Sequence, residues 1–260
     1  EAVLRFQANA RGELLPSGGP VKVKNDGQAV LQTDAMADAL QNDMNAYLTT
    51  VATEYYPDTD KMLFSVGFGG CGFKKVYHCP LRNRPVSESV DAKDLIVPTN
   101  ATDLRNASRI THQIEMSPNT VKRMQLLGVY RDVDLYQPMA TPANPVDAKI
   151  AATSGQAPNT TRPEDQDYIL RECLCELNLP GFEDVDENGE PTGLKLPYRV
   201  TLEKDSKQVL EIRRNWRKDD PTKKAKQVFV KYPFVPGLGF YDIGLLNILG
   251  NATLALTAAW

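Results

Sequence analysis

A run of basic side chains between residues 213 and 226 is the feature of the sequence best suited to bind an anion. Its cations surround one tryptophan, and the set consists of Arg213, Arg214, Trp216, Arg217, Lys218, Lys223, Lys224 and Lys226. Cationic groups neutralise phosphates, and an aromatic ring beside them can stack on a base. The run therefore predicts a contact with phosphate or with an acidic patch on a neighbouring subunit. Asp219 and Asp220 offset part of the charge, so a solvated hairpin tip is the alternative.

An acidic segment matches the first half of a calcium-binding loop. Oxygen-bearing side chains recur at Asp184, Asp186 and Asn188, and Gly189 occupies the position where such loops turn sharply. The match then fails, because the twelfth position holds Lys195 in place of a bidentate glutamate. An acidic hairpin turn built on Asn188 and Gly189 is the rival interpretation.

Three glycines, Gly67, Gly69 and Gly72, have the G-x-G-x-x-G spacing of a dinucleotide-binding turn. Such a site needs a strand before the glycines and a helix after them, so that the helix N-terminus meets the pyrophosphate. Here the next residues, FKKVYH (73–78), have the pattern of a strand. Close backbone packing between a helix end and a sheet is therefore the preferred interpretation, and a nucleotide-using enzyme is the alternative.

The cysteines and histidines could hold zinc or supply a nucleophile. The residues concerned are Cys71, His78, Cys79, His112, Cys173 and Cys175. Structural zinc sites usually contain two C-x₂₋₄-C pairs, whereas this chain offers one C-x-C pair and one adjacent His-Cys. We therefore expect free thiols in a reducing compartment, with a metal-using enzyme as the alternative.

The overall composition excludes several classes of protein. The chain has 260 residues, of which 42% are hydrophobic and 24% charged, so neither a wholly disordered chain nor a disulfide-dense scaffold fits. The net charge of −3 gives no global signal for nucleic acid. The longest apolar stretch, residues 238–260, contains Asp242, Asn247 and Asn251, which favours a buried helix over a membrane span. Because the chain begins at Glu1 and ends inside this stretch, we expect a piece of a longer polypeptide.

Hydrophobic periodicity predicts the elements that position these residues. Helical spacing predicts helices over 1–15, 34–53, 58–70 and 117–128. Alternation predicts strands over 73–78, 85–90, 93–98, 109–116, 168–179, 197–203, 208–216 and 227–234, and residues 21–25 have the pattern of a short polar strand. Helices and strands are segregated, so we expect an α+β fold with helices packed on a mainly antiparallel meander of short strands. The expected division is a helical part with a small sheet over 1–135, a flexible loop or insertion over 136–167, and a β-meander followed by an apolar helix over 168–260.

Several stretches, in the same order along the chain, resemble the portal (head–tail connector) proteins of short-tailed, double-stranded-DNA bacteriophages. They are FKKVYHCP (73–80), PVSESVDAKDLIVP (85–98), ATDLRNASRITHQI (101–114), SPNTVKRMQLLGVYRDVDL (117–135), EIRRNW (211–216) and YPFVPGLGFYDIGLL (232–246). EAVLRFQANA (1–10) and GPVKVKNDG (19–27) fit the same family. The resemblance covers most of the chain apart from residues 137–167. This piece is similar to the portal wing and the core beside it.

The resemblance implies a structural protein of the virion rather than an enzyme, with no catalytic residues, cofactor or metal to carry over. Such proteins assemble in the bacterial cytoplasm into a ring of about twelve subunits at one capsid vertex. The ring joins head to tail and forms the conduit for genome packaging and ejection. Its implied partners are further copies of itself, terminase, major capsid or scaffold proteins, tail adaptors and the double-stranded DNA in the channel, but no membrane. A calcium-dependent or other binding module using Asp184–Gly189 and a nucleotide- or metal-using enzyme are the alternative functions.

Overall fold

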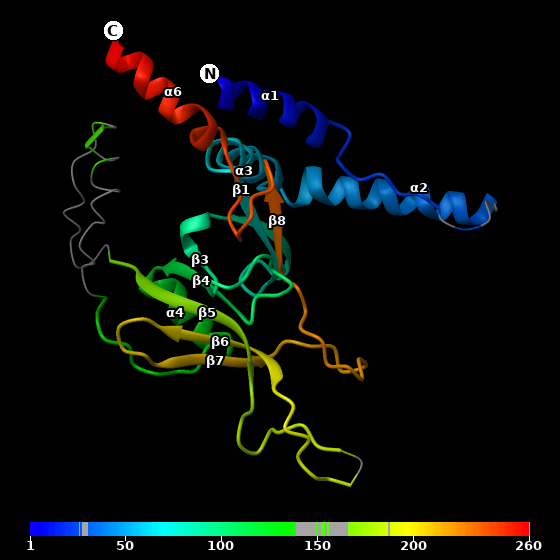
Figure 1. The fold of residues 1–260 in the computed structure, drawn as a ribbon. Helices are drawn as coiled ribbons and strands as arrows, with labels where there is room; N and C mark the ends of the chain where they lie inside the picture. Colours follow the sequence, from blue (N-terminus) through cyan, green and yellow to red (C-terminus); the bar gives the residue numbers. More distant parts are fainter. Residues whose placement is uncertain are drawn as a thin grey trace. The chain divides into compact units, whose positions relative to one another are not determined.

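The chain forms two compact units. The computed structural model describes residues 1–25, 27, 31–138, 149, 152, 153, 155, 166–186 and 188–259. Unit 1 contains Glu1–Lys93, Thr99–Ala107 and Gln227–Trp260, and unit 2 contains Asp94–Pro98 and Ser108–Lys226. Helices and antiparallel sheets build the chain, so the expected α+β class is confirmed (Figure 1). The two units interleave in sequence, which differs from the expected division at 135 and 167, and most of the expected loop at 136–167 lies outside the described residues.

Unit 1 is built on a three-stranded antiparallel sheet in the order β2-β1-β8. The strands are β1 (Cys71–Cys79), β2 (Arg84–Val90) and β8 (Phe229–Pro233). Strand β8 pairs with β1 from Cys71↔Pro233 to Lys75↔Phe229. The sequence predicted that this last strand would continue the meander of the preceding hairpins. It pairs instead with a strand more than 150 residues earlier, and local alternation carries no information on such a partner.

Four described α-helices belong to unit 1, and one of them, α3 (Tyr55–Gly69), packs against β1 and β2 of this small sheet. The others are α1 (Ala2–Leu14), α2 (Leu31–Ala46) with the π-helical turn η1 (Tyr47–Val51), and α6 (Leu245–Ala259). Helix α3 buries Met62, Leu63 and Val66, and Phe6 of α1 and Phe234 pack against this cluster. The rings of Phe6 and Phe234 meet edge to face with their centroids 4.9 Å apart. Helix α1 is therefore attached to α3 by the ring of Phe6 together with polar contacts from Gln7 and Arg11 to Asp60.

The segment before α2 is extended but is not a strand, which corrects the prediction for residues 21–25. Side chains of α2 take the place of a partner strand. The side-chain amide of Asn45 accepts from the Val21 backbone N–H at 2.9 Å and donates to the Val21 carbonyl at 3.0 Å, and Gln41 accepts from the Val23 N–H at 3.1 Å. The alternating pattern was correctly extended, but the hydrogen bonds that it needs come from a helix.

Two buried ion pairs fasten unit 1. The ammonium group of Lys74 on β1 lies 2.7 Å from Asp58 of α3, and its side chain is only 2% exposed. The same carboxylate accepts from the backbone N–H and the hydroxyl of Ser89 on β2, so it joins one helix to two strands. Lys231 of β8 lies 2.8 Å from the buried Asp242 and also donates to the Phe240 carbonyl at 2.6 Å, which secures the loop before α6.

Unit 2 is built on a five-stranded antiparallel sheet in the order β3-β4-β5-β6-β7. Its strands are β3 (Leu95–Ile96), β4 (Arg109–Met116), β5 (Tyr168–Leu177), β6 (Leu196–Glu203) and β7 (Val209–Arg214). The order follows the sequence, so this part is the expected meander. A β-bulge shifts the register of β6 and β7 after Thr201.

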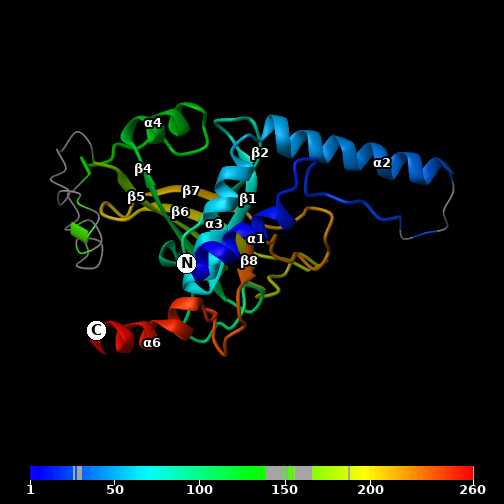
Figure 2. The same cartoon turned by 90° about the horizontal axis from the view of Figure 1, so that it is seen from above.

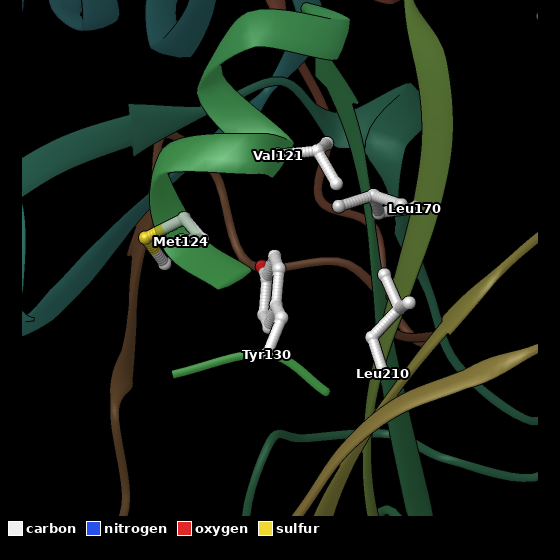
Figure 3. Close-up of a cluster of buried hydrophobic side chains, with 5 residues drawn as sticks. All are labelled: Val121, Met124, Tyr130, Leu170 and Leu210. Atoms are coloured by element: carbon white, nitrogen blue, oxygen red, sulfur yellow. The ribbon is translucent and has the colours of Figure 1, made fainter. Parts of the chain in front are cut away.

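Helix α4 (Pro118–Leu126) covers one region of this sheet. It begins as the sequence predicted, with Ser117 as the N-cap and Pro118 in the first turn. Val121 and Met124 reach from α4 to Leu170 of β5 and Leu210 of β7 (Figure 3). The ring of Tyr130 completes the cluster, which is the apolar core of unit 2.

Helix α6 is the clearest departure from expectation. The sequence predicted a buried helix, yet none of its fifteen residues, all of which the structure describes, is buried. It is attached at its first turn, where Gly244 approaches Gly70 so closely that a Cβ on Gly244 would lie 2.4 Å from the Gly70 nitrogen. Among the described residues, no helix combines the length and the hydropathy that a membrane crossing requires. High hydropathy predicted the helix correctly but gave no information on what covers it.

Candidate functional site

The basic run forms the end of β7 and a closed loop after it in unit 2. Asn215 closes the loop: its carbonyl accepts from the Lys226 N–H at 2.8 Å, and its side-chain amide donates to the Lys226 carbonyl at 3.2 Å. The Asn215 N–H also donates to the Pro197 carbonyl at the start of β6. Residues 216–225, called the basic loop below, are therefore held at the edge of the sheet by one buried asparagine.

A tight turn at Asp220 shapes the tip of the basic loop. One carboxylate oxygen accepts from the Thr222 N–H at 2.9 Å and from its hydroxyl at 2.6 Å, and the other accepts from the Lys224 N–H at 3.0 Å. The hydrogen bonds from Thr222 and Lys224 hold the pKa of Asp220 below its usual value. This carboxylate is thus committed to the backbone, so it shapes the turn in addition to offsetting charge.

Three of the predicted basic side chains contact other side chains of the same chain. Arg213 pairs with Glu211, a buried carboxylate that Arg199 also contacts at 3.0 Å. The guanidinium of Arg214 lies 5.6 Å from the centre of the Trp216 ring, which packs edge to face on Tyr198 with centroids 5.4 Å apart. The indole ring is therefore engaged inside unit 2 by one cation and one aromatic ring.

The third of these side chains links the basic loop to the acidic segment. Lys223 forms an ion pair with Asp184, whose other oxygen accepts from the Thr192 hydroxyl at 2.7 Å. The hydrogen bond from Lys223 lowers the pKa of Asp184, and the bond from Thr192 adds to this effect. The sequence suggested that the basic and acidic segments could meet between subunits. At this pair they meet inside one chain.

The remaining four cations are Arg217, Lys218, Lys224 and Lys226. All four are exposed, and none forms an ion pair with any residue that the structure describes. They are therefore the part of the predicted set that can neutralise an external anion. Sequence patterns alone did not identify Glu211, Arg199 and Asn215 as part of this site. The pairing of β6 with β7 is the signal that could have placed Arg199 beside Arg213.

The acidic segment forms a hairpin turn. Asp186 accepts from the N–H groups of Asn188 and Glu190 at 2.9 Å each, and Gly189 has a φ of +83°. Val185 and Pro191 form a β-bridge on either side of the turn. Asp184 is already paired with Lys223. Among the residues that the structure describes, the two aspartates thus have the partners that a hairpin gives them, as the rival interpretation expected.

The glycine-rich segment ends a helix rather than beginning one. Gly70 closes α3 with a φ of +98°, and β1 follows directly. A Cβ on Gly67 would lie 2.6 Å from the Phe6 ring, and one on Gly72 would lie 2.7 Å from Val66. Both glycines thus permit close packing, as preferred from the sequence. No helix N-terminus follows these glycines to receive a pyrophosphate.

The cysteines are free thiols. Cys71 and Cys79 are buried at opposite ends of β1, and Cys173 and Cys175 are half-buried on β5. Burial raises the pKa of the Cys71 and Cys175 thiols, which reduces their thiolate fraction. The described part of the chain contains no group of three or more His, Cys, Asp or Glu side chains placed to hold a metal ion.

Neither a family model nor a curated protein matches this chain. Its function has therefore to be inferred from its own residues, from the quoted series of portal-like segments and from the surfaces described above. Two surfaces stand out for this purpose: the four exposed cations at the basic loop, and the uncovered helix α6.

Proposed function

We propose that the chain is part of a structural subunit of a ring-shaped phage portal. In this role it joins the head to the tail and forms the conduit through which the genome is packaged and ejected. The ordered series of segments that resembles portal proteins supports the proposal, because it extends from residue 1 to residue 246 and involves both units. The terminase, capsid or scaffold and tail-adaptor contacts of a portal belong to the same proposal.

The exposed state of α6 is the structural observation that carries the proposal. This helix has no charged residue, and leucine and isoleucine side chains are exposed along its length. A helix that is apolar all round is normally buried, and a large exposed apolar patch marks an interaction surface. A subunit whose neighbours cover α6 resolves this conflict. A self-contained monomeric enzyme does not.

The charge distribution fits a DNA conduit. The net charge is −3, and the basic run contributes four exposed cations that form no ion pair within the described part of the chain. Each phosphate contact adds a salt-sensitive hold on DNA, so a channel through which DNA slides should contain few of them. The four exposed cations suit either a sparse contact with phosphate or a contact with a neighbouring subunit.

Electron microscopy and native mass measurement of the full-length protein test the proposed class. A closed ring of about a dozen subunits is the expected result, because repeated head-to-tail interfaces close into rings. A stable monomer that binds a nucleotide or calcium saturably would overturn the proposal in favour of an enzyme or a binding module.

A charge-reversal pair tests the role of the basic loop. We expect Lys218→Glu combined with Lys224→Glu to weaken either ring assembly or DNA packaging. The matched control combines Lys195→Glu with Lys207→Glu, since these exposed lysines of unit 2 lie outside the loop and the change in net charge is the same. Equal behaviour of the two double variants would mean that the basic loop is solvated surface.

A further inference from the structure

An apolar pocket in unit 1 opens between the end of α2 and the β1–β2 hairpin. Its volume is about 510 Å³, and Met44, Leu48, Val51, Val76 and Val86 are among the side chains that line it. Val51 and Val76 are about half exposed although they line a concave surface. A pocket of this size and composition is suited to apolar side chains.

The outer face of α2 extends this pocket into a groove. Met36, Leu40 and Met44 follow one another at intervals of four residues, so they lie on one face of the helix, and they are 75%, 50% and 43% exposed. An adjacent face is occupied, because Gln41 and Asn45 bind the extended segment 21–25. The stripe and the pocket share Met44 and form one surface, called the α2 groove below.

Helix α6 has the shape and the chemistry to fill the α2 groove. Leu246, Leu249 and Leu256 lie on one of its faces and are all exposed. The described part of α6 is about 22 Å long at the helical rise, which is enough to contact the side chains from Met36 to Val51. The helix carries no charge, and so brings no like charge to the acidic groups at the rim of the groove.

Those acidic groups are Asp43 and Glu54. Glu54 already pairs with Arg84 at 2.8 Å, so it needs no cation from a partner. An uncharged helix can therefore cover the groove without disrupting the ion pair of Glu54 and Arg84. A basic peptide would find only Asp43 as a free carboxylate among the described lining residues.

Helix α6 does not reach the groove of its own chain. Within unit 1, α2 and α6 extend from α3 in opposite directions in both views (Figures 1 and 2). One chain therefore presents an apolar helix on one side and an apolar groove on the other. Two different complementary patches on one subunit generate a head-to-tail interface, which closes into a ring when the rotation allows it.

We propose that α6 of one copy docks into the α2 groove of the next copy. This inference rests on the proposed function, since it names the interface that assembly of the portal subunit uses. The occupant is a second copy of this chain, and the contact is between α6 and the stripe of Met36, Leu40 and Met44, continued into the pocket.

Photo-cross-linking of the full chain tests this contact. A photoreactive p-benzoylphenylalanine in place of Leu40 should give covalent dimers whose second attachment site maps to residues 245–259. The same replacement of Asn42, which is exposed on another face of α2, is the matched control and should give no such product. Attachment to another segment, or no dimer at all, would overturn the proposal.

A pair of α6 variants provides the second test. Leu249→Asp places a charge on the docking face and should raise the concentration at which the protein assembles at least tenfold. Asn251→Asp adds the same charge on the opposite face and should leave assembly unchanged. Both positions are exposed, so circular dichroism should report the same folded structure for both variants.

The outcomes separate this inference from the proposed function. A ring that forms equally well with Leu249→Asp overturns the docking proposal and leaves the portal function standing. A protein that never assembles, in any variant, overturns both. Binding to phosphatidylcholine vesicles that Leu249→Asp abolishes, without self-association, would assign α6 to a lipid surface and overturn docking.

Discussion

The two units of this chain hold their helices in different ways. In unit 2 the short helix α4 buries Val121 and Met124 in an apolar cluster on the sheet. In unit 1 neither α1 nor α6 has a buried residue, and two buried ion pairs join α3 to β1 and β8 to the loop before α6. The buried cluster of unit 2 thus fixes α4 on the sheet, whereas unit 1 leaves α6 and the α2 groove uncovered. The contrast teaches that a helix is fixed by its buried apolar face in unit 2, whereas α1 and α6 of unit 1 bury none of their residues.

Removal of the carboxylate at Asp58 is the strongest test of how buried ion pairs stabilise unit 1. Asp58→Ala leaves the ammonium group of Lys74 buried without its partner and removes the bonds from Ser89, so we expect a loss of about 3–5 kcal/mol in the free energy of unfolding. Urea denaturation followed by circular dichroism measures this loss.

The exposed pair of Lys122 and Asp132 in unit 2 supplies the control for that experiment. Both side chains are more than half exposed, so Asp132→Ala should cost no more than about 1 kcal/mol. If the two variants lost equal stability, buried ion pairs would not distinguish the units.

The apolar cluster of unit 2 is tested in the same way. Leu170 is completely buried, and Leu170→Ala removes contacts with α4 and leaves a cavity, so we expect a loss of about 2–5 kcal/mol. Leu126→Ala on the same helix is the control, because Leu126 is 79% exposed. Trp216 fluorescence, measured in a Trp260→Phe background, reports unit 2. A small effect of Leu170→Ala would show that the cluster contributes little to the stability of this unit.

The sequence predicted most elements of both units correctly but could not predict their long-range partners. Alternation located β4 through β7, and the Ser117–Pro118 pair located the start of α4, because these signals are local. The pairing of β8 with β1 depends on residues more than 150 positions apart. The hydrophobic periodicity of either segment contains no information about this pairing.

The candidate site shows the same limit. The basic run was visible in the sequence, but its division into internal and free cations was not. Lys223 meets Asp184 across 39 residues, and Arg213 meets Glu211 because both lie on β7 beside β6. Composition counts charges, and only the fold shows which of them are already paired.

A pH titration tests the ion pair of Glu54 and Arg84 at the surface of unit 1. The hydrogen bond and charge of Arg84 lower the pKa of Glu54 from 4.5 to about 2. Because the folded-state pKa is depressed, this carboxylate stabilises the fold above pH 4.5, and the contribution is lost as the pH falls toward 2. Between pH 4.5 and pH 2, the urea midpoint should fall less in Glu54→Gln than in the unchanged protein. A direct NMR titration of Glu54 that gave the ordinary value would contradict the pairing.

The smallest expected effect concerns the start of α4, where the two units also differ. The Ser117 hydroxyl accepts from the Thr120 N–H at the beginning of this helix, whereas the N-cap residues of α1 and α3, Glu1 and Glu54, form no such side-chain bond. Ser117→Ala should therefore destabilise unit 2 by about 1 kcal/mol. Ser117→Asp should restore the lost stability, because aspartate also caps helices and its negative charge is favourable at a helix N-terminus. Trp216 fluorescence during urea denaturation, in the same Trp260→Phe background, measures both variants. If Ser117→Asp were as unstable as Ser117→Ala, the hydroxyl would act through packing rather than as a cap, and α4 would depend on its buried face alone.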